Sequence, residues 1–232
     1  MPRAVIFDVD GVLVDSYAAH YASWRDALRE NGLELSEDDF ARTFGRTSRE
    51  VIRELFRGEV DDAQVREIDA RKEALYRDVV ARDFPAMDGA VELVDALHAA
   101  GFLLAVGSSA PPPNVELTLE RLGRRAAFAV AVTGRDVTRG KPDPQVFEIA
   151  AERLGIEPAR CAVIEDAALG IAAASAAGMT PVALVGTARE EQLREAGAAL
   201  VVRSLRELGP EAIARAIDAH VARRRAQPRR SS

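Results

Sequence analysis

The chain has 232 residues, of which 48% are hydrophobic and 29% are charged, a composition typical of a soluble globular protein with one large domain or a core and a smaller lobe. A net charge of -6 gives no electrostatic basis for nucleic acid as the main partner, and the single cysteine, Cys161, excludes an intramolecular disulfide. No segment is long and apolar enough to span a membrane, and the N-terminal apolar run meets Asp8 too early for a signal peptide, so we expect a cytoplasmic protein.

The N-terminal third begins with one strand and continues with helices. Residues 4–7, Ala-Val-Ile-Phe, predict a buried strand that ends in the carboxylates of Asp8 and Asp10. From Tyr17 to about Arg82 the apolar residues recur at helical spacing. We expect helices within residues 20–32, 36–45, 48–58 and 62–81, before Pro85 and Gly89 interrupt the pattern.

Strands and helices alternate through the rest of the chain. We predict strands, each followed by a helical segment, at residues 102–108, 127–133, 160–166, 180–186 and 198–202. Continuous apolar strands separated by helices favour an α/β fold with a parallel sheet covered on both faces. The first strand joins this sheet, so the all-helical stretch is an insertion. We therefore expect a core of residues 1–15 and 87–232 and a helical domain of residues 16–86.

Polar residues stand where the predicted strands end, and in a parallel sheet these ends lie along one edge, where ligands bind. The residues are Asp8, Asp10, Gly11, Ser108, Ser109, Lys141, Glu165 and Asp166. Several carboxylates at one edge repel one another unless a cation lies among them, and oxygen ligands suit Mg²⁺. The lysine and the serine hydroxyls suit the oxygens of a phosphoryl group. The sequence therefore predicts a magnesium and phosphate site.

The two aspartates after the first strand suit two catalytic roles. Asp8 is placed to attack phosphorus and form an aspartyl-phosphate, and Asp10 to protonate the leaving oxygen and then deprotonate water. Gly11 lets the backbone turn sharply beside the phosphate. Each motif alone has a structural alternative, since Lys-Pro-Asp-Pro starts a helix and Glu165 with Asp166 caps the next one. Their joint occurrence at strand ends favours the catalytic interpretation.

The sequence resembles the haloacid dehalogenase superfamily of phosphotransferases in four motifs, which read FDVDGVLVDS, VGSS, GKPDP and IEDAALGI. The resemblance implies a Rossmann-like core with a helical cap inserted after the first motif. It also implies that Asp8 is the nucleophile, that Asp10 is the general acid and base, and that Ser108 and Lys141 hold the phosphoryl group. Mg²⁺ would be held by the side chains of Asp8 and Asp166 and the backbone carbonyl of Asp10, with Glu165 near or in the shell.

Within the superfamily the chain looks closest to phosphoglycolate phosphatases, small sugar phosphatases and β-phosphoglucomutases. The dehalogenases lack an aspartate at the position of Asp10, which argues against that chemistry. The likeness to β-phosphoglucomutase implies substrate contacts from His20, Lys72 and Arg49, with Arg46 as a competitor for the role of Arg49. The structural alternative is a packed or solvent-facing position for His20 and surface positions for the other three.

We therefore expect a Mg²⁺-dependent phosphatase that hydrolyses a small phosphorylated metabolite, a sugar phosphate or phosphoglycolate. The alternatives are a β-phosphoglucomutase-like mutase and a non-catalytic binding protein on the same fold. We expect a monomer, because no extended apolar surface is evident, and a solvated tail at residues 222–232. The sequence does not identify the substrate.

Overall fold

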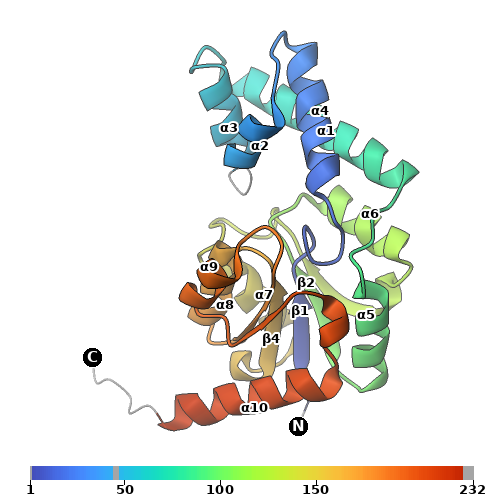
Figure 1. The fold of residues 1–232 in the computed structure, drawn as a ribbon, viewed down its shortest axis with the longest axis vertical. Helices are drawn as coiled ribbons and strands as arrows, with labels where there is room; N and C mark the ends of the chain where they lie inside the picture. Colours follow the sequence, from blue (N-terminus) through green and yellow to red (C-terminus); the bar gives the residue numbers. More distant parts are fainter. Residues whose placement is uncertain (1, 44–46, 227–232) are drawn as a thin grey trace. The chain divides into compact units, whose positions relative to one another are not determined.

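The structure, a computed structural model, describes residues 2–43 and 47–226 and separates into two units. The sheet unit contains Met1–Asp15 and Ala86–Ser232, and the helical unit contains Ser16–Pro85. Because the helical unit follows the first strand, the chain leaves the sheet unit once and returns to it once (Figure 1). The fold is a Rossmann-like α/β core with an all-helical insertion, as the sequence predicts.

Six parallel strands form the sheet in the order β3-β2-β1-β4-β5-β6. Their bounds are β1 Ala4–Phe7, β2 Leu103–Gly107, β3 Phe128–Val132, β4 Cys161–Glu165, β5 Thr180–Leu184 and β6 Leu200–Val202. The central strands β1, β4 and β5 are buried throughout, as expected for apolar strands covered on both faces. The register aligns Phe7 of β1 with Val106 of β2 and Ile164 of β4. The residues that follow these three strands therefore lie next to one another.

Helices cover the sheet on both sides. They are α5 (Ala90–Ala99), α6 (Pro112–Leu122), α7 (Gln145–Leu154), α8 (Ala168–Ala176), α9 (Glu190–Glu195) and α10 (Pro210–Ala226). Phe147 of α7 and Ala173 of α8 pack into one apolar core with β1 and β4, and Figure 1 shows α5 on the opposite side of the sheet. Cys161 is fully buried in the same core. The sheet and its helices thus form a closely packed scaffold for the loops at its edge.

The helical unit contains α1 (Tyr17–Glu30), α2 (Glu37–Thr43), α3 (Ser48–Leu55) and α4 (Asp62–Arg82). Its core includes Trp24, Leu28, Phe40 and Ile52. The start of α2 is capped, because the backbone N–H of Asp39 donates to the Ser36 hydroxyl at 3.1 Å. The unit therefore has its own apolar core.

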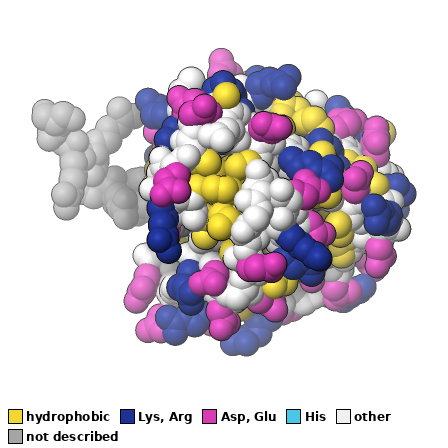
Figure 2. Space-filling model, turned by 90° about the horizontal axis from the view of Figure 1, so that it is seen from above, with side chains coloured by type: hydrophobic (Ala, Val, Ile, Leu, Met, Phe, Trp, Pro, Cys, Tyr) yellow, Lys and Arg dark blue, Asp and Glu magenta, His cyan; other side chains and the backbone are white. Residues whose placement is uncertain are grey.

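The surface carries both signs of charge. Figure 2 shows Lys and Arg side chains interspersed with Asp and Glu over the face in view. Such mixing is typical of solvent-facing protein surfaces. Within the described part of the chain, no helix has the length and apolar character needed to cross a membrane.

Candidate active site

The site forms where β1, β2 and β4 end. Asp8 directly follows β1, Ser108 follows β2, and Glu165 is the last residue of β4 with Asp166 after it. The backbone N–H of Asp8 donates to the carbonyl of Ile164 at 3.0 Å, which continues the pairing of β1 with β4 by one residue. Motifs that are more than 150 residues apart in the chain, such as Asp8 and Glu165, are thereby brought together at one sheet edge.

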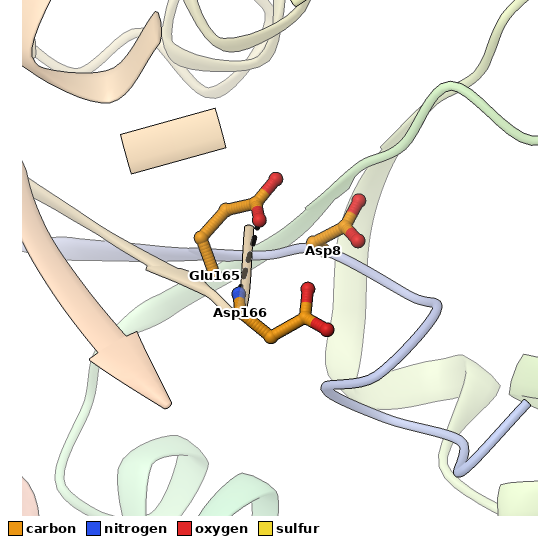
Figure 3. Close-up of side chains that lie close together, drawn as sticks. All are labelled: Asp8, Glu165 and Asp166. Carbon is orange, nitrogen blue, oxygen red and sulfur yellow. Dashed lines mark hydrogen bonds between the residues drawn. The ribbon is translucent and has the colours of Figure 1, made fainter. Parts of the chain in front are cut away.

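Three buried carboxylates meet at this edge. Asp8, Glu165 and Asp166 each offer an oxygen atom, and these atoms lie within 4.8 Å of one another. Figure 3 shows the carboxylates of Asp8 and Asp166 beside each other, whereas the carboxylate of Glu165 turns back toward the backbone N–H of Asp166. Buried carboxylates this close repel one another, and oxygen donors are what Mg²⁺ prefers. The donor set therefore fits a magnesium ion.

Lys141 supplies positive charge to the cluster. Its Nζ donates to Oδ1 of Asp8 at 2.7 Å and to Oε1 of Glu165 at 2.6 Å, and its side chain is only 11% exposed. Burial disfavours the charged ammonium, but Asp8 and Glu165 outweigh that effect and raise the pKa of Lys141 above its ordinary value. The lysine stays protonated, so its single charge faces three carboxylates.

The aspartates of the cluster resist ionisation when no cation is bound. Burial raises the pKa of Asp8 well above its ordinary value, although Lys141 opposes this shift. Burial likewise raises the pKa of Asp166 to about 7, with a further contribution from the negative charge of Glu165. The charge of Asp10 adds to both shifts, so Asp10 lies within electrostatic reach of the two aspartates. Protonation of these carboxyl groups and binding of a metal cation are therefore two ways to relieve the repulsion between them.

Glu165 has a structural task as well. Its Oε2 accepts hydrogen bonds from the backbone N–H groups of Asp166 and Ala167, both at 3.0 Å. These donors precede the first turn of α8, where the N-cap residue Ala167 has no side-chain oxygen to offer. The capping role that the sequence left as an alternative is thus present for Glu165, together with its contact to Lys141.

Gly11 shapes the turn after β1. Its φ of +74° lies in the left-handed region, and its backbone N–H donates to the carbonyl of Val14 at 2.8 Å. A Cβ atom at this position would lie 2.0 Å from Oδ2 of Asp166. Gly11 therefore allows the backbone to turn here and leaves room for the carboxylate of Asp166.

The two serines after β2 differ in their surroundings. Ser108 is buried, and its hydroxyl accepts the backbone N–H of Ala110 at 3.1 Å. Ser109 is exposed in the same loop. Both residues belong to the sheet edge that carries Asp8, and Ser108 keeps its hydroxyl hydrogen available for a ligand oxygen.

Three of the predicted substrate-binding residues belong to the helical unit. Lys72 of α4 is buried; its Nζ contacts Nδ1 of His20 at 3.2 Å and Oε1 of Glu73 at 2.6 Å. The ring of His20 stacks on Tyr76 with centroids 4.2 Å apart. His20 and Lys72 are thus brought together between α1 and α4.

Arg49 lies elsewhere in the same unit. It is exposed in the first turn of α3, a helix that begins with a capping box between Thr47 and Glu50. Its competitor Arg46 lies outside the described residues.

One residue of the sheet edge, Thr187, was not predicted from the sequence. Thr187 follows β5, and its hydroxyl forms a hydrogen bond with the carboxylate of Asp166. Burial raises the pKa of this carboxyl, whereas the hydrogen bond from Thr187 lowers it. The next residue holds the same loop against Asp166, because the backbone N–H of Ala188 donates to the carbonyl of Asp166 at 3.1 Å. The signal was present, since the predicted strand 180–186 ends directly before Thr187 at the same edge.

Comparisons with known proteins find relatives over most of the chain. The sequence profile of haloacid dehalogenase-like hydrolases matches residues 2–178. Validoxylamine A 7'-phosphate phosphatase of Streptomyces hygroscopicus subsp. limoneus is 34% identical over 203 residues, which cover 84% of this chain and 92% of that protein. Beta-phosphoglucomutase of Bacillus subtilis is 31% identical over 213 residues, covering 89% of this chain and 91% of that protein.

A solved structure extends the likeness to the fold. The crystal structure of a HAD hydrolase, family IA, variant 3 from Entamoeba histolytica superposes with a TM-score of 0.84. It is 28% identical, and the match covers 93% of this chain and 99% of that one. The likeness therefore includes both the α/β core and the helical insertion.

Proposed function

The chain belongs to the family of haloacid dehalogenase-like hydrolases, and from this premise we propose that it is a Mg²⁺-dependent phosphatase of a small phosphorylated metabolite, working through an aspartyl-phosphate. One observation carries the proposal. Lys141 bridges Asp8 and Glu165 beside the buried carboxylate of Asp166, at the sheet edge where ligands of such folds bind. Phosphoryl transfer to a side chain requires a carboxylate nucleophile, a fixed positive charge and oxygen ligands for a metal ion.

We assign the covalent step to Asp8. One of its carboxylate oxygens attacks phosphorus, the bond between phosphorus and the leaving oxygen breaks, and Asp10 gives that oxygen its proton. Asp10 then takes a proton from water, the water oxygen attacks phosphorus, and the bond between phosphorus and Asp8 breaks. Inorganic phosphate leaves, and both aspartates return to their starting states.

The remaining residues bind and orient the phosphoryl group. Lys141 holds an ammonium against Asp8, and the buried hydroxyl of Ser108 is available as a donor on the same edge. Asp8, Asp166 and the Asp10 carbonyl would hold Mg²⁺, with Glu165 beside them; the ion supplies positive charge that lowers the repulsion between the nucleophile and the phosphoryl oxygens. Burial of this cluster strengthens each of these electrostatic contacts.

The start of α6 supports a phosphatase over a mutase. A sugar-phosphate mutase works with a bisphosphate and must hold a second phosphoryl group. The loop after Ser109 leads into Pro111, Pro112 and Pro113, which form the start of α6 and have no backbone N–H groups to donate to an anion. Because the three prolines offer neither backbone donors nor charged side chains, this loop suits a substrate with one phosphoryl group.

The mutase stays the second candidate because of the helical unit. His20 and Lys72 lie together there, and beta-phosphoglucomutase of Bacillus subtilis is among the relatives. Substrate contacts from His20, Arg49 and Lys72 remain predictions. The buried contacts of Lys72 with Glu73 and His20 also support a structural role in joining α1 to α4.

The test is phosphate release from a panel of sugar phosphates, phosphoglycolate and other small phosphomonoesters, with Mg²⁺ or with EDTA. We expect hydrolysis with Mg²⁺, little with EDTA, and none above background for Asp8→Asn; Glu152→Gln, an exposed change on α7, is the matched control with full activity. Failure across the whole panel would favour a non-catalytic binding protein.

A second assay separates phosphatase from mutase. The protein is incubated with β-glucose-1-phosphate and a bisphosphate primer. Inorganic phosphate supports the phosphatase, whereas glucose-6-phosphate without net phosphate release identifies a mutase.

A further inference from the structure

Gly170 occupies a position where a glycine is unfavourable for the helix that contains it. It is the third residue of α8, whose other residues are mostly alanine, and its backbone is helical rather than left-handed. Glycine inside a helix is less stable than alanine by about 1 kcal/mol. The backbone conformation therefore does not explain this glycine, and a reason must lie in its surroundings.

The space beside Gly170 is filled by the carboxylate of Glu165. A Cβ atom on Gly170 would lie 1.9 Å from Oε1, 2.0 Å from Cδ and 2.5 Å from Oε2 of Glu165. The three nearest heavy atoms thus all belong to this one side chain. Real Cβ atoms do not approach other atoms this closely, and the carboxylate would have to move.

Glu165 has little freedom to move away. Its side chain is 1% exposed, and its two oxygens accept hydrogen bonds from Lys141, Asp166 and Ala167 at 2.6 to 3.0 Å. Figure 3 shows the carboxylate turned toward the backbone N–H of Asp166, which precedes α8 in the chain. A methyl group on Gly170 would break some of these bonds, since all of them depend on the same carboxylate position.

The effect reaches the nucleophile through Lys141. The ammonium of Lys141 lies between Glu165 and Asp8, at 2.6 Å and 2.7 Å from their oxygens. A displaced Glu165 would therefore displace the ammonium relative to Asp8. We propose that Gly170 is a positioning residue of this site, whose lack of a side chain fixes the Glu165 carboxylate and, through it, the ammonium of Lys141 against Asp8. The effect on turnover rests on the proposed function.

A double-mutant cycle tests the proposal. The four proteins are wild type, Gly170→Ala, Glu165→Asp and the double variant, because Glu165→Asp keeps the charge but withdraws the carboxylate from the added methyl group. Gly209→Ala is the control, since the nearest atom to its new Cβ is 3.9 Å away and its φ is not left-handed. The measurements are kcat and KM on the best substrate of the panel and the denaturation midpoint without metal.

We expect Gly170→Ala to lower kcat by about 10- to 100-fold, as a misplaced catalytic group does, and to lower the midpoint. In the Glu165→Asp background the same change should alter kcat by less than about twofold and leave or raise the midpoint, because the conflict is gone. Gly209→Ala should leave both quantities unchanged. This rescue would not follow from a general packing role.

Two results would overturn the proposal. One is an unchanged kcat and midpoint for Gly170→Ala; the other is an equal loss in both Glu165 backgrounds, which would place the effect of the methyl group elsewhere. If the wild type hydrolyses no substrate of the panel, the proposed function fails, but the midpoints still decide whether Gly170 and Glu165 are coupled.

Discussion

Replacing Asp166 with asparagine should stabilise the metal-free protein while removing its response to Mg²⁺. The change keeps the shape of the side chain and deletes one of three crowded negative charges. Burial raises the pKa of Asp166 from 3.8 to about 7, a shift of about 3 pH units. At about 1.4 kcal/mol per unit, ionising this carboxyl costs the folded state on the order of 4 kcal/mol. We expect Asp166→Asn to raise the free energy of unfolding by about 2–4 kcal/mol at pH 8 in EDTA.

The gain should depend on pH in a defined direction. Because the folded-state pKa of Asp166 is raised, its contribution to stability is fully present below 3.8 and is lost as the pH rises through about 7. The asparagine variant has no such titration. The difference in stability between variant and wild type should therefore be small at pH 4, grow between pH 4 and pH 7, and level off above pH 7.

Magnesium should reverse the order of stability. The wild type gains about 4 kcal/mol when the free ion is at about 1,000 times its dissociation constant, because the ion binds only the folded state. Asp166→Asn lacks a ligand and should gain far less. Excess Mg²⁺ should therefore bring the wild type to or above the stability of the variant at pH 8.

Cys161 provides an assay for the sheet unit alone. The thiol is fully buried in β4, and burial raises its pKa to about 12, so it should react with a disulfide reagent only after the sheet unit unfolds. Thiol labelling across a urea series, with EDTA or Mg²⁺, gives the four midpoints. Glu152→Gln is the control for loss of an exposed carboxylate. An Asp166→Asn protein that is less stable than wild type in EDTA at pH 8, or equally stabilised by Mg²⁺, would refute the reasoning.

Three further predictions follow from single contacts. Gly11→Ala forces a left-handed φ on alanine and places its methyl group on Asp166, so Mg²⁺ affinity measured by calorimetry should fall at least about tenfold; unchanged affinity would contradict the geometry. Asp136→Asn should lower stability by about 1–2 kcal/mol at pH 7, since hydrogen bonds from Arg153 and from the backbone and hydroxyl of Thr133 lower the pKa of Asp136 to about 2. The difference in urea midpoints between variant and wild type should shrink as the pH falls from 4 to 2, and a constant difference would contradict this cause. Cys161 should stay unlabelled by a disulfide reagent at pH 8 in native buffer over hours, and rapid labelling would contradict its burial.

The strands were predictable because they are apolar runs, most of them with a polar residue directly at or after their end. Residues 4–7 are predicted as a strand and form β1, and Asp8 then marks the point where the apolar run ends and the site begins. The ends of helices were less accessible. The helix α1 begins at Tyr17, three residues before the predicted segment, and Ser16 makes no side-chain cap that would have marked this start. Near the C-terminus, α10 begins at Pro210, a residue that suits the first position of a helix.

The site was predictable in its residue types and not in its internal contacts. Strand ends identify Asp8, Lys141 and Asp166 as neighbours, because parallel strands share one edge. The orientation of the Glu165 carboxylate depends on the backbone N–H groups of Asp166 and Ala167 and on the absence of a side chain at Gly170. No residue pattern shows these contacts. The sequence indicates which groups meet, whereas their hydrogen bonds decide which way each carboxylate faces.

The most direct test of the central claim is to trap the phosphoryl group on Asp8. Asp10→Asn is incubated with acetyl phosphate and Mg²⁺, because acetate leaves without protonation whereas water attack still needs the missing base. Acid quenching and peptide mass spectrometry should then find one phosphoryl group on Asp8, and none at that position after Asp8→Asn is added to the same variant. A phosphoryl group on another residue, or consumption of acetyl phosphate while Asp8 stays unmodified throughout, would contradict the account.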